Sequence, residues 1–230
     1  MKKLFTLILI AVFVLPSMAQ TPPPMPSKEK KLNLTVFLQG LYNGTDMNKA
    51  QDFVAGNPVD KFSGTIADVI TVELHDAVTY ATINYTVLAD LNQNGTATTG
   101  GKTYISIPNT YSGSYYITVK HRNHVETTTA NPVSFTDANI TCNFTDAATK
   151  AFGSNMKLLA PGVYGLFAGD INGDGLIEPL TDLAAVKATI DTYGSGYVPS
   201  DINGDGNIEP LTDLAMVKAA IDTYVTAILP

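Results

Sequence analysis

The chain of 230 residues has no Trp and a single Cys, Cys142. One Cys excludes an intrachain disulfide, although an exported protein would meet conditions that permit one. In Ile140-Thr141-Cys142-Asn143-Phe144, the Cys alternates onto the same side as Ile140 and Phe144. We therefore expect a small buried apolar side chain at this position rather than a nucleophile or a metal ligand.

The apolar run at the N-terminus is too short for a membrane span. Leu4 to Leu15 follows Lys2 and Lys3 and falls well below the roughly 20 residues that a spanning helix needs. Pro16-Ser17-Met18-Ala19 then offers the small residues at which signal peptidase cleaves. Residues 1–19 are thus predicted to be a signal peptide rather than an anchor. No Cys follows the run to which a lipid could be attached, as in a lipoprotein. We therefore expect a secreted, extracellular or cell-surface protein without a transmembrane segment after cleavage.

Positive charge is scarce in the last quarter of the chain. Residues 170–230 contain ten acidic residues and two lysines, a net charge of −8, whereas residues 20–169 contain eleven acidic and ten basic residues. This distribution argues against nucleic acid as a partner and favours cations.

Alternating apolar residues dominate the middle of the chain. Residues 20–31 contain three consecutive prolines and mixed charges, which is typical of an exposed linker. Residues 32–165 show repeated period-two patterns separated by Gly-, Asn- and Pro-containing turns, which predict an antiparallel β-sandwich. The patterns include Leu32, Leu34, Val36 and Leu38; Ile70, Val72 and Leu74; Ile83, Tyr85 and Val87; and Tyr115, Ile117 and Val119.

A nearly exact repeat follows. Residues 170–193 and 201–224 are offset by 31 positions and differ at three aligned pairs only, 176/207, 185/216 and 189/220. Each copy opens with Asp-x-Asn-x-Asp-Gly and continues with an amphipathic helical pattern beginning near Pro179 or Pro210. The apolar faces expected for the two helices are Leu180, Leu183, Val186 and Ile190, and Leu211, Leu214, Val217 and Ile221.

The spacing within each copy suits calcium. Ca²⁺ takes six to eight oxygen ligands, which alternate residues of a tight loop can point at one centre. Loop position 6 is Gly175 or Gly206, where the chain turns sharply, and position 7 contributes its backbone carbonyl. Ile177 and Ile208, at position 8, are expected to pair the two loops and to point into the core. The expected ligands at positions 1, 3, 5 and 7 are Asp170, Asn172, Asp174 and Leu176, and Asp201, Asn203, Asp205 and Asn207. Ordinary turns are the alternative, since they use the same residue types.

The paired loops and helices, without a helix entering the first loop, resemble the type I dockerin module. The resemblance covers residues 166–230 and rests on both Asp-Ile-Asn-Gly-Asp-Gly motifs and the helical pattern after each. It implies a small α-helical module, two Ca²⁺ ions, folding that depends on them, and docking to a cohesin. Such modules are usually attached to enzymes or binding proteins that act on polysaccharides.

One position departs from that family. The family has an acidic ligand at loop position 12, where this chain has Thr181 or Thr212, and the acid comes one residue later, at Asp182 and Asp213. A one-residue bulge near each Pro would bring these carboxylates to the ion. Alternatively, the position 9 residues Glu178 and Glu209 close the shell, or Asp182 and Asp213 serve only the first helical turn.

Two other clusters have simpler interpretations. Asp90-Leu91-Asn92-Gln93-Asn94-Gly95 opens like a calcium loop, but no acid follows at the closing positions, so we expect a polar hairpin turn. His121, Arg122 and His124 are interpreted as an ordinary strand end. The stretch from Ser114 to His124 also resembles a β-rich module that precedes dockerin-like repeats in secreted proteins of some Gram-negative bacteria. This resemblance does not indicate any particular activity.

No common catalytic motif is present, so an enzyme is not the favoured interpretation. The first hypothesis is a calcium-binding extracellular protein whose β-sandwich serves binding or adhesion. The second is a component of a polysaccharide-degrading assembly that docks to a cohesin-like protein. The third is a small glycoside hydrolase, whose paired carboxylates need not form a sequence motif. It is the weakest, because the sandwich has few acids and a domain of this size leaves little room for a sugar cleft. A glycan is the other expected partner, and the ligand of the sandwich stays open.

Overall fold

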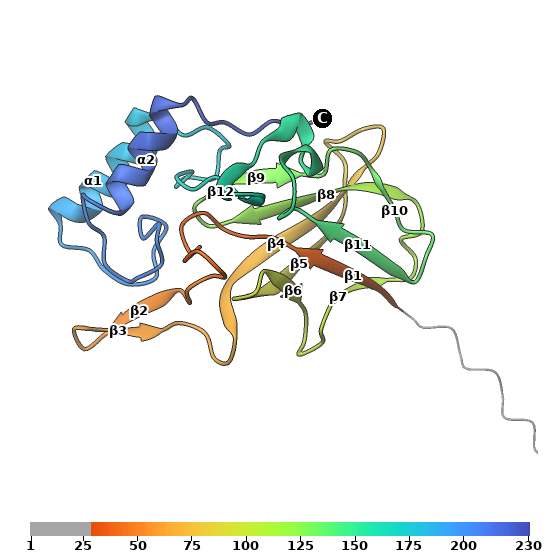
Figure 1. Cartoon of the computed structure of the whole chain (residues 1–230), viewed down its shortest axis with the longest axis horizontal. Helices are drawn as coiled ribbons and strands as arrows, with labels where there is room; N and C mark the ends of the chain where they lie inside the picture. Colours follow the sequence, from red (N-terminus) through yellow and green to blue (C-terminus); the bar gives the residue numbers. More distant parts are fainter. Residues whose placement is uncertain (1–28) are drawn as a thin grey trace, which may run out of the picture.

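The computed structural model describes residues 29–230 (Figure 1). The predicted signal peptide, residues 1–19, and most of the predicted linker, residues 20–31, lie outside the described residues. Among residues 29–230, none of the helices has the length and apolar character required to cross a membrane.

The described chain is mostly β, as predicted, and its largest sheet has nine strands. Neighbouring strands run in the order β10-β8-β4-β5-β6-β1-β11, and β9 and β7 pair with β8 and β1. All of these pairs are antiparallel except β1–β11. The nine strands are β1 (Glu29–Thr35), β4 (Ile66–Asp76), β5 (Ile83–Asn92), β6 (Thr96–Thr98), β7 (Ile105–Pro108), β8 (Ser114–His121), β9 (His124–Thr128), β10 (Val133–Ser134) and β11 (Asn139–Asn143).

Two small hairpins and two 3₁₀ turns complete the β-rich part. The hairpins are antiparallel and each has two strands. They are formed by β2 (Gln51–Val54) with β3 (Asn57–Asp60), and by β12 (Lys157–Ala160) with β13 (Val163–Gly165); the turns are η1 (Ala148–Lys150) and η2 (Phe152–Ser154).

The alternation read from the sequence produces the core. Ile70, Val72 and Leu74 of β4 are fully or almost fully buried, and they pack with Ile117 and Val119 of the neighbouring strand β8. Strand β5 departs from the expected pattern at its first residue only, because Ile83 is 48% exposed. Tyr85 and Val87 are partly buried and pack against the core, as expected. Strands β4 and β8 therefore contribute their alternating apolar side chains to the core.

The first strand begins earlier than the sequence predicted. Strand β1 starts at Glu29, inside the segment expected to be a linker. Lys30 is buried and its Nζ donates hydrogen bonds to the carbonyls of Thr136 and Asp137, 3.4 and 3.3 Å away. Charged residues that looked like an exposed leader thus belong to the sheet. A local pattern does not show this, because the partners of Glu29 lie 73 to 77 residues away and those of Lys30 more than 100.

Cys142 is buried in β11, as predicted. It belongs to the hydrophobic cluster of the sheet, and burial raises the pKa of its thiol to about 12. Its burial agrees with the small apolar side chain expected at this position.

The acidic repeats fold at one end of the sheet (Figure 1). A π-helical turn, η3 (Pro179–Leu183), leads into α1 (Ala184–Asp191), and the second copy forms α2 (Asp213–Asp222) beside α1. Val186 and Val217 are fully buried in a second hydrophobic cluster, which also includes Val125 of β9. The repeats therefore share their core with the edge of the sheet.

The predicted helical faces are wrong at one residue in each copy. Leu180 and Leu211 are 85% and 89% exposed, although the period of the pattern placed them inward. Both precede the regular helix: Leu180 lies in η3, and α2 starts only at Asp213. An α-helical period does not apply across a π-helical turn, so the projected face is displaced there.

Candidate metal centre

The carboxylates of the first loop accept hydrogen bonds from the loop's own residues. Asp170 accepts hydrogen bonds from the amides of Gly173 and Gly175, at 2.8 and 3.0 Å. Asn172 donates to Asp174 at 2.7 Å, and Asp174 accepts the amide of Leu176 at 2.8 Å. The residues expected at positions 1, 3 and 5 therefore belong to one compact turn.

The second loop repeats most of this pattern. Asp201 accepts the amide of Gly206 through Oδ2 at 3.2 Å, and Asn203 donates to Asp205 at 2.8 Å. Asp205 in turn accepts the amide of Asn207 at 2.8 Å. One bond is missing relative to the first loop: Oδ1 of Asp201 is buried and has no hydrogen-bond partner.

The displaced acids reach back into the loops. Asp182 is fully buried and accepts the amides of Ile171 and Glu178, at 2.7 and 2.9 Å. Asp213 is equally buried and accepts the amides of Ile202 and Glu209, also at 2.7 and 2.9 Å. In each copy, one carboxylate joins the start of the loop to its end.

The predicted one-residue bulge is confirmed in the backbone. In η3, the amide of Leu183 bonds to the carbonyl of Glu178, five residues earlier, at 3.2 Å. The second copy has the matching bond from Leu214 to Glu209, also at 3.2 Å. A π-helical turn accommodates one residue more than an α-helical turn. Whether the extra residue brings Asp182 and Asp213 to an ion, as predicted, is part of the proposed function.

The alternative closing residues are less well placed. Glu209 is exposed, and Glu178 is partly exposed and accepts a 3.3 Å bond from the Thr181 hydroxyl. The buried pair Asp182 and Asp213 thus fits the closing role better than the position 9 glutamates.

The expected pairing between the two loops is wrong. Leu176 of the first loop pairs with Thr226, beyond α2, and Asn207 of the second loop pairs with Ser195, beyond α1. The first loop therefore pairs with the segment after α2, and the second loop pairs with the segment after α1. Ile177 and Ile208 still point into the core, with 3% and 7% of their surfaces exposed.

Burial gives the first acid of each loop an unusual proton affinity. Burial, assisted by the negative charge of Asp182, raises the pKa of Asp170 to about 6 even though two amides stabilise its charged form. Burial raises the pKa of Asp201 to about 7, although Arg122 opposes the shift, and Asp213 and Asp205 contribute to it. A carboxylate whose charge is this costly is suited to a cation.

The donor set fits Ca²⁺. Each loop combines three acids, one Asn and the position 7 carbonyl, which are the hard oxygen donors that Ca²⁺ prefers. Within residues 29–230, no three His, Cys, Asp or Glu side chains converge as a ready metal-binding group, because the loop carboxylates are turned onto backbone amides. The unpartnered oxygen of Asp201 is the exception, since a buried carboxylate oxygen is costly without a donor or a cation.

A buried polar network that the sequence did not predict adjoins the second loop. Asp68 of β4 accepts a 2.5 Å bond from the Tyr197 hydroxyl and lies 3.1 Å from Nε2 of His121 and 3.4 Å from Nε of Arg122. Burial alone would raise the pKa of Asp68, but His121 and Arg122 hold it well below its usual range. The strand end expected at residues 121–124 is confirmed, yet its side chains also join the sheet to the repeats.

The network fixes the tautomer of His124. Nε2 of His124 accepts the amide of Gly40 at 3.2 Å, so its proton must lie on Nδ1. That nitrogen lies 2.8 Å from Oδ1 of Asn123, which accepts its proton, and 2.9 Å from Nδ1 of His121. Burial lowers the pKa of His124 well below its usual value, which agrees with a neutral ring.

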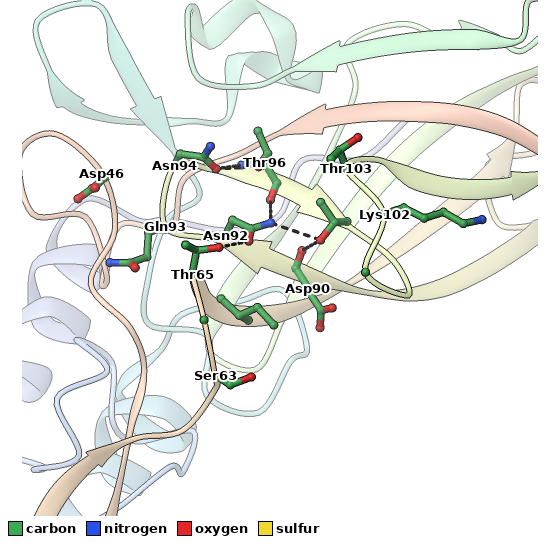
Figure 2. Close-up of a pocket in the computed structure, with 14 residues that line it drawn as sticks. Asp46, Ser63, Thr65, Asp90, Asn92, Gln93, Asn94, Thr96, Lys102 and Thr103 are labelled. Carbon is green, nitrogen blue, oxygen red and sulfur yellow. Dashed lines mark hydrogen bonds between the residues drawn. The ribbon is translucent and has the colours of Figure 1, made fainter.

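The segment that opens like a third calcium loop is a hairpin turn, as predicted. Strands β5 and β6 pair antiparallel around it, and Asn94 accepts bonds from the amide and hydroxyl of Thr96. Asn92 bonds to Thr65 at 2.8 Å and to the carbonyl of Thr96 at 2.9 Å. Figure 2 shows these side chains turned toward one another along a polar groove of about 790 Å³ that Asp90 also lines.

Four large apolar side chains on the repeats are exposed in matching positions. Besides Leu180 and Leu211, Tyr193 and Tyr224 are 94% and 91% exposed. Each pair is separated by the 31 residues of the repeat. The two copies thus present the same apolar residues to solvent.

Comparisons with protein-family models, with curated proteins and with solved structures gave no match for this chain.

Proposed function

We propose that this is a secreted or cell-surface calcium-binding protein, in which a sandwich-like β-rich domain for binding or adhesion is carried with a dockerin-like module of two calcium loops. The observation that carries the proposal is Oδ1 of Asp201, a buried carboxylate oxygen without a partner at position 1 of a loop rich in oxygen donors. A bound cation would supply what this oxygen lacks.

Two ions are proposed, one in each loop. The first would be held by Asp170, Asn172, Asp174, the carbonyl of Leu176 and Asp182, and the second by Asp201, Asn203, Asp205, the carbonyl of Asn207 and Asp213. Bound Ca²⁺ would neutralise carboxylates that repel one another, and so would stabilise residues 166–230.

Thermal unfolding of the chain without residues 1–19 tests this function. Calcium that binds the folded state alone adds about 2.7 kcal/mol per site at 100 times the dissociation constant. We expect millimolar Ca²⁺ to raise the unfolding temperature of the repeats, whereas Mg²⁺ has little effect because it requires a smaller, more rigid octahedral site. Equal stabilisation by the two ions, or by neither, would remove the support for calcium.

Docking to a cohesin-like protein is the second candidate, and the matching exposed pairs favour it. Large apolar side chains with about nine-tenths of their surfaces in solvent contribute little to folding but suit the centre of an interface. The double change Leu180→Ser with Leu211→Ser should leave the unfolding temperature unchanged and abolish binding to cohesin domains in calorimetry. Binding that survives this change, or no binding by the unchanged chain, would count against docking through these residues.

A further inference from the structure

The two calcium loops have almost the same sequence but different surroundings. In the first loop, the side chains of Asn172, Asp174 and Leu176 are exposed. In the second loop, no residue from Asp201 to Ile208 is exposed. The second loop is covered because it lies against the β-rich part of the chain.

Close backbone contacts seat the second loop there. The amide of Gln51, at the start of β2, donates to the carbonyl of Gly204 at 2.8 Å. Gly40 approaches so closely that an added Cβ would lie 1.9 Å from the carbonyl oxygen of Ile202. An added Cβ on Gly204 would lie 2.2 Å from the Leu41 side chain, whereas one on Gly173, the equivalent residue of the first loop, would meet nothing within 4 Å.

Arg122 binds the backbone at the entry of the second loop. Its Nη1 donates to the carbonyl of Asp201 at 2.8 Å and to that of Val198. Its Nη2 lies 3.9 Å from Oδ2 of Asp201. The neighbouring Asn123 donates to the same Asp201 carbonyl at 2.8 Å. Position 1 of the second loop is therefore held by two side chains from the turn between β8 and β9.

The guanidinium group also contacts Asp68 and Tyr197, while its Nη2 has no hydrogen-bond partner. Nε of Arg122 faces Asp68 at 3.4 Å, and the Tyr197 ring lies 4.4 Å from the guanidinium carbon. Tyr197 in turn donates to Asp68, so the arginine cannot move without breaking this buried group. No residue of the described first loop has an Arg or Lys partner among its hydrogen bonds and ion pairs.

We infer that Arg122 is a positioning residue for the second calcium loop: it fastens the loop entry to the sheet, so this loop keeps its shape without calcium while the first loop depends on the ion. The inference rests on the proposed calcium function. Bonds from a charged, buried donor are among the stronger ones in proteins, and they act whether or not an ion is present.

Hydrogen exchange of the whole chain without residues 1–19, measured by mass spectrometry in EDTA and in Ca²⁺, tests the inference. In EDTA, residues 170–178 should exchange at least about tenfold faster than residues 201–209. Calcium should slow exchange in the first loop more than in the second. Equal exchange of the two loops in EDTA would overturn the inference even if calcium slows both.

Arg122→Gln gives the second arm. Loss of the charged donor should speed exchange at residues 201–209 in EDTA by about tenfold and leave residues 170–178 unchanged. Arg122→Lys keeps the charge but not the paired donors and should restore only part of the protection. Peptides from β4 report whether the sheet stays folded. If the sheet unfolds in Arg122→Gln, Arg122→Lys decides the question: unchanged exchange at residues 201–209 in that variant would overturn the role of Arg122.

The same data separate the inference from the proposed function. If calcium alters exchange in neither loop, the calcium function fails, whatever the difference in EDTA. If calcium protects both loops but Arg122→Gln loosens both equally or neither, the function stands and the role of Arg122 is wrong.

Discussion

The first loop, residues 170–178, and the second, residues 201–209, differ at a single aligned position, yet they do not form the same structure. One faces solvent and satisfies both oxygens of its first acid with its own amides. The other lies against the sheet, is fastened by Arg122 and leaves Oδ1 of Asp201 without a partner. Duplicated sequences acquire separate properties from what they pack against, and the loop motif alone does not specify those properties.

The largest effect should come from separating the second loop from the sheet. In Gly40→Ala, the new methyl group would lie 1.9 Å from the carbonyl oxygen of Ile202, and backbone must move to accept it. We expect a loss of about 3 kcal/mol or more in the free energy of unfolding. Gly113→Ala is the control, since its nearest contact, 3.3 Å away, is the movable hydroxyl of Tyr115. Similar denaturation midpoints for the two variants would show that the loop is not seated as described.

A matched glycine pair sharpens the comparison between loops. Gly173 and Gly204 have nearly the same left-handed conformation, with φ of 72° and 74°, so alanine strains both equally. Only Gly204→Ala also meets the Leu41 side chain. Its unfolding free energy should fall by about 1–3 kcal/mol more than that of Gly173→Ala. Equal losses in urea denaturation would mean that both loops are equally open.

The displaced acids should act on their own loops. Asp182→Ala and Asp213→Ala should each weaken calcium binding of one loop by at least tenfold, about 1.4 kcal/mol, because each removes a buried carboxylate. Asp213 accepts a further bond, from the amide of Asn203 at 3.3 Å, so its loss should disturb the second loop more. Weaker binding in Glu178→Ala and Glu209→Ala, with Asp182→Ala and Asp213→Ala unaffected, would assign the closing ligand to the glutamates instead.

The smallest expected difference is in pH dependence. The folded, calcium-free chain holds the Asp170 proton with a pKa of about 6 and the Asp201 proton with a pKa of about 7, both above the ordinary value of 3.8. The folded state therefore binds more protons than the unfolded state, and stability in EDTA should fall as pH rises from about 4 to 7. Calcium must displace these protons, so its apparent affinity should rise with pH over the same range. For the second loop the rise should continue to a pH about one unit higher, because the pKa of Asp201 is higher than that of Asp170. Calcium affinities that do not change with pH would contradict these pKa values.

Sequence periodicity predicted the β-rich fold because apolar residues of β4 and β8 recur at every second position. The burial itself does not alternate, since the polar residues Glu73, His75 and Thr118 between them are buried as well. The sequence also located both loops, and the misplaced acids correctly predicted a bulge before each helix. These features depend on neighbouring residues, which a single sequence displays directly.

What the sequence did not reveal depends on contacts between distant segments. Lys30 finds its partners more than 100 residues away, and Asp68 meets Arg122 and Tyr197 from separate parts of the chain. The exchange of partners between each loop and the chain after the other helix is likewise invisible in a local pattern. Nothing in the residues around Arg122 distinguishes it from a strand-end arginine in solvent.

Calorimetric titration of calcium into the chain without residues 1–19, and into Asp170→Ala and Asp201→Ala, tests the central claim most directly. Position 1 is a proposed ligand whichever acid closes the loop, so each change should remove one site. We expect two Ca²⁺ per unchanged chain and one per variant, with dissociation constants no weaker than about 10⁻³ M. Absence of binding at millimolar calcium, or equal stoichiometry in all three chains, would contradict the account.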